Sequence, residues 1–408
     1  MKTSLKYGKQ KIEFMVPERA EFLGIKEPEF NVDRKKFERK FLESLPQTPD
    51  KYTNVGIVVS DKTRLCGYPL YLPWVLEILQ RRGAKKENIH IYIAYGTHPK
   101  QTEEESLSSY GETYRGYDFI HHDCYNEAAF TRLGTTHRGT PVKIRKDILQ
   151  SSLVITFGAI SHHYFAGYGG GRKLLFPGLA DRKSIYANHA LFLDRDKKTL
   201  AEGCQPGNLD GNPLAEDLKE IDDYLPAKIS IHGILNTKGE VAELLVGNSY
   251  EDFISACKMH DSYYRSGNEQ QFDMVIASSG GYPKDINFIQ AHKSIHHAAA
   301  FVRDGGKLII LSECIDGIAS KFFLKYLEAG SFEKAYKMLE RNYEGNGGTA
   351  LSMMTKTNRI QIYMMTSLEE ELCGILHVTK VDVKRVQQLL DSESGSIAVI
   401  GNASLLVR

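Results

Sequence analysis

The sequence has no apolar stretch approaching the ~20 residues needed to cross a bilayer, and Met1 to Val16 alternates polar and apolar residues without a signal-peptide core. It also has almost no net charge, since 52 Lys and Arg residues face 51 Asp and Glu residues for a formal charge of +1. No basic surplus exists to neutralise nucleic-acid phosphates. We therefore expect a cytoplasmic protein whose partners include neither a membrane nor a nucleic acid.

Cysteine is scarce, and no two cysteines form a C-x-x-C pair. This pattern argues against a disulfide framework and fits reduced thiols in a cytosol. Internal repeats and low-complexity tracts are also absent. What remains is an ordinary globular composition, 42% apolar and 25% charged over 408 residues. That length is too great for one ordinary core and predicts two domains. The six cysteines are at positions 66, 124, 204, 257, 314 and 373.

Strands and helices alternate along the chain. Apolar, β-branched runs at Asn54–Ser60, Asn88–Tyr95 and Ser151–Ile160 predict buried strands, each followed by glycine or polar residues. A polar run at 265–271 lacks apolar residues and marks the best domain boundary. We predict an α/β protein of two domains, 1–267 and 268–408, each a parallel or mixed sheet flanked by helices. The active site is expected in the interdomain cleft, where ligand sites are common.

The stretch Ser161–Leu193 concentrates the chemistry-bearing residues. Gly169, Gly170 and Gly171 lack a Cβ, so their backbone could approach a phosphate or ring, although a glycine triplet is more often a flexible turn. Lys173 lies beside an apolar run, and partial desolvation would lower its pKa and leave neutral amine for covalent chemistry. Taken alone, its sequence context favours a solvated surface lysine over a functional one. The polar groups follow a strand end, where α/β sheets bind ligands.

His189, in the sequence Ala-Asn-His-Ala, could ligate a metal through neutral imidazole. A histidine satisfied on a helix is the alternative interpretation. No cysteine or second histidine lies at zinc-finger spacing nearby, which argues against an ordinary structural zinc site.

Two earlier segments have the same plan of a strand followed by polar side chains. The first strand ends in Asp61, Thr63 and Arg64, where Arg64 could bind a carboxylate bidentately. Asp61 and Thr63 could instead only satisfy backbone donors ahead of the next helix. His98, in Gly-Thr-His-Pro, stands between a strand end and a helix, a common place for a catalytic imidazole.

In the second domain, a predicted helix at 286–302 carries Gln290 and Lys293 on one face, since they are three residues apart. Two solvated polar residues would look the same. His292 and His296 have a spacing that could hold a metal, but no acidic third ligand accompanies them.

Together these segments resemble the nickel-pincer-nucleotide-dependent lactate racemase family. The central motif reads H-x-x-A-G-x-G-G-G-x-K-x-x-x-P-G followed by N-H, from His163 to His189. D-x-T-R, G-T-H and Q-x-x-K occur in the family's order. Each short motif is weak, whereas the ordered set, which spans most of the chain, is specific.

The resemblance implies an isomerase: a racemase or epimerase of a lactate-like 2-hydroxy acid that works by hydride transfer. Its cofactor would be nickel in a pyridinium-3-thioamide-5-thiocarboxylic acid mononucleotide linked to Lys173, supplied by cofactor-synthesis proteins. The first domain would carry the cofactor lysine, the nickel histidine and the catalytic histidines. The implied roles are His98 and His163 as catalytic bases, His189 as nickel ligand, Arg64, Gln290 and Lys293 as substrate contacts, and Asp61, Thr63, Gly169, Gly170, Gly171 and Lys173 as cofactor contacts.

One position departs from the family's pattern. An aromatic residue is expected directly before Gln290, and Ile289 stands there, which leaves room for a 2-hydroxy acid other than lactate. Two other functions remain open from the residues alone. A cofactor-carrying protein without catalysis would need the glycines and Lys173 but not the pair of histidines. A conventional divalent-metal hydrolase or lyase would use the histidines as ligands.

Overall fold

The structure, a computed structural model, describes the backbone of residues 1–408 and every side chain except those at positions 49 and 321. The chain forms two compact units. The central unit comprises Glu27–Leu191 and Glu202–Tyr263, and the terminal unit comprises Met1–Lys26, Phe192–Ala201 and Tyr264–Arg408. Each is an α/β unit built on one sheet of six strands, which confirms the predicted fold class.

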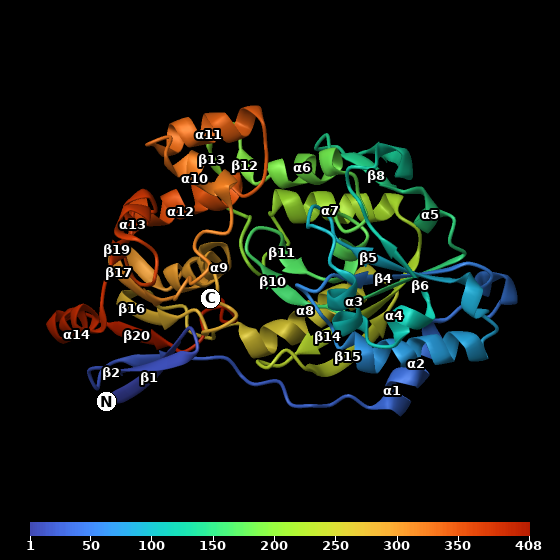
Figure 1. Ribbon diagram of the computed structural model, residues 1–408, viewed down its shortest axis with the longest axis horizontal. Helices are drawn as coiled ribbons and strands as arrows, with labels where there is room; N and C mark the ends of the chain where they lie inside the picture. The colour runs from blue at the N-terminus through green and yellow to red at the C-terminus, as the bar shows by residue number, and fades with distance from the viewer. The chain divides into compact units, whose positions relative to one another are not determined.

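The sheet of the central unit has the order β15-β14-β9-β4-β5-β6 (Figure 1). All neighbouring strands are parallel except β14 and β15, which form an antiparallel hairpin around Asn236–Gly239. Every residue of β4 is buried, as expected of a parallel strand covered on both faces. The strands are β4 (Val55–Ser60), β5 (Ile89–Ala94), β6 (Asp118–His121), β9 (Leu153–Ala159), β14 (Lys228–Leu235) and β15 (Val241–Gly247).

Helices and short strands connect this sheet. Helix α3 (Glu103–Tyr110) begins with a capping box. The hydroxyl of Thr102 accepts from the amide of Glu105, and the carboxylate of Glu105 accepts from the amide of Thr102. The other helices are α1 (Arg34–Ser44), α2 (Tyr68–Arg81), α4 (Thr113–Gly116), α5 (Lys146–Leu149), α6 (Arg182–Ala190), α7 (Pro213–Tyr224) and α8 (Tyr250–Tyr264), with 3-10 turns η1 (Pro49–Tyr52), η2 (Lys86–Asn88) and η3 (Glu127–Ala129) and the pair β7 (Phe130–Thr135) and β8 (Pro141–Arg145).

The glycine-rich stretch, expected to be a loop, is more ordered than its composition suggests. It forms a small antiparallel pair, β10 (Ser161–His163) and β11 (Gly167–Gly169), followed by a 3-10 turn, η4 (Gly171–Leu174). The pair follows β9 directly. Because β9, β4 and β5 are adjacent and parallel, the segments after their carboxyl ends lie at one edge of the sheet.

The terminal unit has a parallel sheet of order β19-β18-β17-β16-β20-β3. Its strands are β3 (Glu21–Leu23), β16 (Phe272–Ser278), β17 (Val302–Leu311), β18 (Gln361–Met365), β19 (Thr379–Lys380) and β20 (Ile397–Ile400), with the short pair β12 (Leu193–Asp194) and β13 (Thr199–Leu200). Its helices are α9 (Phe288–Ala299), α10 (Lys321–Leu327), α11 (Phe332–Arg341), α12 (Gly347–Arg359), α13 (Glu370–Ile375) and α14 (Val383–Ser392). No helix among the described residues is long and apolar enough to cross a membrane.

The first residues of the chain belong to this terminal unit. The opening hairpin, β1 (Lys2–Tyr7) and β2 (Gln10–Met15), turns at Gly8, whose φ is positive. Its buried Leu5 and Phe14 pack with Met274 and Ile276 of β16. The predicted boundary at 267/268 lies close to Tyr264, where the chain returns to the terminal unit. The hairpin precedes this boundary in the sequence but belongs to the terminal unit, because its buried side chains pack there. Sequence order does not reveal this packing.

Candidate active site

Asp61, directly after β4, organises the polar groups at the edge of the central sheet. Its side chain is 3% exposed. One carboxylate oxygen accepts from the amide and the hydroxyl of Thr63 at 2.9 and 2.6 Å. The other lies 2.6 Å from Nδ1 of His98, which follows β5. Burial raises the pKa of Asp61, but the hydrogen bonds from His98 and Thr63 and the charges of His98 and Arg64 outweigh it, so the net pKa is lowered.

The Asp61 carboxylate therefore remains ionised and holds a hydrogen on Nδ1 of His98, which leaves the Nε2 lone pair of a neutral ring available as a base. The His98 side chain is 39% exposed, so that nitrogen can be reached. Both residues are candidates from the sequence, but nothing in their spacing predicts that they contact each other.

The positions of Gly170 and Gly171 leave no room for a side chain. Their φ angles are +77° and +53°, in the left-handed region. A Cβ on Gly170 would lie 2.3 Å from the carbonyl oxygen of Ala159, and one on Gly171 would lie 2.8 Å from the Phe253 ring. Packing alone thus explains both glycines, and they set the direction in which the next turn presents Lys173.

Lys173 lies on η4, half-buried, and its amide donates to Gly170 at 3.1 Å. Burial, with the nearby charges of Arg64 and Arg172, holds its pKa well below the usual value for lysine. A lysine in these surroundings has a larger share of neutral, nucleophilic amine than an ordinary surface lysine.

His189 lies on α6, which Asp181 caps. Its Nδ1 lies 2.7 Å from the carbonyl oxygen of Ile185, so the ring donates there and Nε2 remains as a potential metal ligand. Burial first, then the charges of Lys173, Arg64 and His98, lower its pKa to about 3. A neutral imidazole is the form that binds a metal.

Arg64, His98 and Lys173 are close enough to His189 for their charges to lower its pKa, so the four residues lie at one site. His163 joins them through Phe165, whose ring centroid lies 4.5 Å from that of His163, 5.3 Å from that of His189 and 6.0 Å from Lys173 Nζ. Phe165 was not singled out from the sequence, because an aromatic residue in this motif has no spacing that distinguishes a site residue from a core residue.

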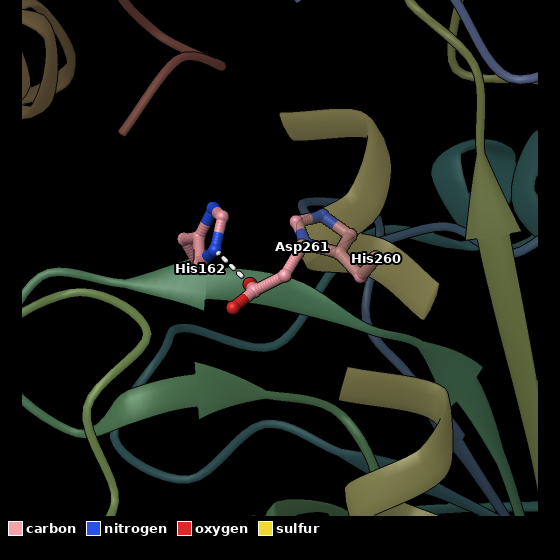
Figure 2. Close-up of side chains that lie close together, drawn as sticks. All are labelled: His162, His260 and Asp261. Atoms are coloured by element: carbon pink, nitrogen blue, oxygen red, sulfur yellow. Dashed lines mark hydrogen bonds and ion pairs between the residues drawn. The ribbon is translucent and has the colours of Figure 1, made fainter. Parts of the chain in front are cut away.

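His162 and His163 are adjacent but have different surroundings. Nε2 of His162 lies 2.7 Å from Oδ1 of Asp261 on α8, and the ring packs at right angles to that of His260 (Figure 2). One ligand atom from each of these three residues lies within 4.8 Å of the others, and no other group of three His, Cys, Asp or Glu among the described residues does so. Nothing in the spacing of His260 and Asp261 pointed to this cluster.

At His163, the amide of Ala166 donates to Nδ1 at 3.2 Å. Because a backbone N–H can only donate, the neutral His163 ring carries its hydrogen on Nε2. The two catalytic histidines expected from the sequence are thus held in opposite tautomers, since His98 carries its hydrogen on Nδ1.

In the terminal unit, Gln290 and Lys293 lie on one face of α9, as their spacing predicts. Nζ of Lys293 donates to Oε1 of Gln290 at 2.8 Å, and both are exposed. Asn287 caps the helix through the amide of Gln290. Ile289 is half-buried and packs against the apolar core of this unit.

Two family models match this chain. The one described as the lactate racemase N-terminal domain covers residues 7–201, and the one described as the lactate racemase C-terminal domain covers residues 268–363. The chain belongs to the lactate racemase family. The resemblance drawn from the motifs is confirmed.

Among relatives of this family, the lactate racemase of Thermoanaerobacterium thermosaccharolyticum is 29% identical over 337 residues, which cover 79% of this chain and 76% of the relative. The lactate racemase of Lactiplantibacillus plantarum is 29% identical over 275 residues, or 66% and 62% of the two chains. The apoprotein structure of the former enzyme superposes over the whole of both chains with a TM-score of 0.88 at 25% identity. A Thermotoga maritima protein shares the fold, with a TM-score of 0.66 at 16% identity over 94% of this chain and 99% of that one.

Proposed function

We propose that this protein racemises a small 2-hydroxy acid of the lactate class. The observation that carries the proposal is the grouping of three residues: His98, oriented by a carboxylate, Lys173, whose pKa is depressed, and His189, whose imidazole is neutral and has Nε2 available for a metal. Membership of the lactate racemase family supports it, as does the name of the relatives.

The residues fit the nickel-pincer nucleotide. A neutral Lys173 amine suits a covalent thioamide link, and Nε2 of His189 can supply one nickel ligand. His189 belongs to no group of three protein ligands among the described side chains, which suits a metal held mainly by the cofactor's own carbon and sulfur. When bound, this cofactor would accept hydride from the substrate α-carbon and return it. Thr63 and the Gly169–Gly171 segment are proposed to contact its nucleotide part.

His98 is proposed to take the substrate hydroxyl proton on Nε2. The buried Asp61 carboxylate would stabilise the imidazolium that forms, at 2.6 Å from Nδ1, so we propose Asp61 as a positioning residue in addition to its expected contact with the cofactor. The exposed guanidinium of Arg64 can hold the substrate carboxylate through a bidentate ion pair.

His163 is proposed to serve the opposite face of the substrate. To accept a proton on Nε2, its neutral ring must first move its hydrogen to Nδ1, which the Ala166 amide opposes. In this conformation Nε2 of His163 is therefore a donor, whereas Nε2 of His98 is an acceptor. Gln290 and Lys293 are proposed as further substrate contacts, and Ile289, in place of an aromatic residue, leaves room for a 2-hydroxy acid other than lactate.

The test is racemisation itself. Protein co-expressed with the cofactor-synthesis proteins should convert L-lactate or a longer 2-hydroxy acid to a mixture of enantiomers, measured by chiral chromatography. Hydrolase or lyase activity restored to cofactor-free protein by zinc or manganese, with no adduct on Lys173, would favour the conventional metalloenzyme instead.

A further inference from the structure

A cavity lies within the central unit, beside η4. Its volume is about 50 Å³, several times the ~10–15 Å³ that one water molecule needs. None of the residues assigned above to the active site lines it. The lining comes from η4, α7, β14 and the start of α8: Arg172, Asp222, Lys228, Ser230, His232, Asn248, Ser249, Tyr250 and Phe253.

Arg172 places a buried charge in this cavity. Arg172 is only 4% exposed, and its Nη1 donates to the hydroxyl of Tyr250 at 3.3 Å. Nε and Nη2 are buried without a hydrogen-bond partner. The guanidinium carbon lies 5.4 Å from the Tyr250 ring centroid and 5.2 Å from that of Phe253. No carboxylate among the described side chains forms an ion pair with it.

This state is costly for a guanidinium. Arginine does not lose its proton in proteins, so a buried Arg172 keeps its charge and its unused N–H donors. Stacking on two rings attracts the cation but satisfies neither Nε nor Nη2. Leaving a buried charge without a partner typically costs several kcal/mol. An anion in the cavity would remove that cost.

The other walls favour an anion as well. Lys228 and Asp222 pair at 2.6 Å and cancel each other, so Arg172 leaves the cavity with an excess positive charge. Both nitrogens of His232 are buried without a partner, and burial lowers the pKa of this ring to about 4, so a neutral imidazole can donate one hydrogen.

The N-terminal end of the fifteen-residue helix α8 also lies at the cavity, next to the lining residues Asn248 and Ser249, and the helix dipole favours negative charge there. The amides of Asn248 and Ser249, just before this helix, already donate to Asp252.

The cavity is separate from the cofactor site although Arg172 and Lys173 are neighbours. In the η4 turn the two side chains diverge: Lys173 lies near Phe165, whereas Arg172 lies against Phe253 and Tyr250. Gly171 touches the wall of the cavity, since a Cβ there would meet Phe253 and His232. A ligand in the cavity would thus brace the turn that carries Lys173.

We propose that this cavity binds a small tetrahedral oxyanion, a phosphate that is either free or the end group of a small phosphomonoester. Its oxygens would accept from Nε and Nη2 of Arg172 in the fork geometry that guanidinium offers to phosphate, with His232 and Lys228 completing the shell. The proposal does not rest on the proposed racemase activity, because it concerns a separate cavity and is tested without cofactor or substrate.

The experiment uses the full-length, cofactor-free protein in a phosphate-free buffer. Inorganic phosphate is titrated by calorimetry and by thermal unfolding, against sodium chloride at equal ionic strength. The wild type should show saturable binding and a rise in melting temperature that chloride does not produce. Arg172→Gln should weaken phosphate binding at least ten-fold, and Lys228→Gln should weaken it several-fold if Arg172→Gln does not fold.

Arg64→Gln is the matched control, since it removes an arginine from the active site and should leave phosphate binding unchanged. AMP as a competitor distinguishes the two sources: displacement of phosphate assigns the cavity to a phosphomonoester, and no displacement assigns it to the free ion. The proposal is overturned if phosphate acts no differently from chloride, if Arg172→Gln binds phosphate normally, or if Arg64→Gln rather than Arg172→Gln abolishes binding.

Discussion

Asp61 and His98, which are 37 positions apart in the sequence, lie with Oδ2 and Nδ1 only 2.6 Å apart at the ends of the neighbouring strands β4 and β5. The carboxylate is almost fully buried and the imidazole is partly exposed. This arrangement lets a fixed negative charge act on a ring that can still reach a substrate. It is the relationship on which the proposed chemistry depends most.

Asp61→Asn should lower turnover by roughly 10²–10⁴-fold, the range expected when general-base catalysis is lost. The amide cannot stabilise the imidazolium of His98. Because Asp61 would act through His98, the double variant Asp61→Asn/His98→Ala should be no slower than His98→Ala, as measured by initial racemisation rates. Asp118→Asn, at the exposed pair His90–Asp118, is the control and should retain activity. Additive losses in the double variant would contradict a shared role.

His98→Ala and His163→Ala should each lower racemisation by about 10²–10⁴-fold, because interconversion needs a base at both substrate faces. Both variants should still carry the cofactor, since neither residue is assigned to it. In the wild type, deuterium at the substrate α-carbon should slow turnover and remain in the product, as mass spectrometry would show. Solvent deuterium at that carbon would mean simple proton abstraction and would exclude hydride transfer.

Lys173→Ala should abolish the covalent adduct. Peptide mass spectrometry of wild-type protein co-expressed with the cofactor-synthesis proteins should place added mass on the peptide that contains Lys173, because this lysine is the half-buried amine of lowered pKa in the site. Lys183→Ala, an exposed lysine of α6, is the control and should keep the adduct. A nickel-bearing, active Lys173→Ala variant would contradict the assignment.

His189→Ala should fold but lose nickel. Its Nε2 is the proposed protein ligand, and nickel readily accepts imidazole nitrogen. Elemental analysis against protein concentration would measure the loss. His162→Ala is a useful comparison, because that residue belongs to the His162–His260–Asp261 cluster and not to the proposed nickel site. Stoichiometric nickel in His189→Ala would remove His189 from the metal site.

Lys356 predicts a pH dependence of stability. It is buried on α12, where Nζ donates to the carbonyl and hydroxyl oxygens of Ser352 at 2.7 and 2.6 Å, and burial lowers its pKa to about 7. The unfolded chain, with an ordinary lysine pKa near 10.4, binds more protons between these two values. The destabilisation is therefore complete below pH 7 and disappears as the pH rises toward 10.4.

Lys356→Met should consequently exceed the wild type in unfolding free energy most at pH 7, and this advantage should shrink by up to about 1.4 kcal/mol per pH unit above that. Denaturant unfolding at pH 7, 8 and 9 would measure it. Lys384→Met, an exposed position of α14, is the control and should show a constant difference. A difference for Lys356→Met that does not change with pH would contradict the lowered pKa.

Short-range patterns in the sequence predicted the local elements and the candidate residues. Apolar runs predicted β4, β5 and β9, and the polar groups after them contain Asp61, His98 and Lys173. The capping box at Thr102 and the hairpin turn at Gly8 are local features of the same kind. These features depend on hydrogen bonds and side-chain periodicity within a few residues, which a short window of sequence contains.

Tertiary structure alone decided which of these residues meet. The Asp61–His98 bond follows from the adjacency of β4 and β5, and the link of His163 to Lys173 and His189 runs through Phe165. The opening hairpin joined the terminal unit because Leu5 and Phe14 are buried against β16, far away in the sequence. The cavity at Arg172 likewise needs η4, β14 and α8 together. Strand order and burial depend on packing over the whole chain, and no local pattern contains that information.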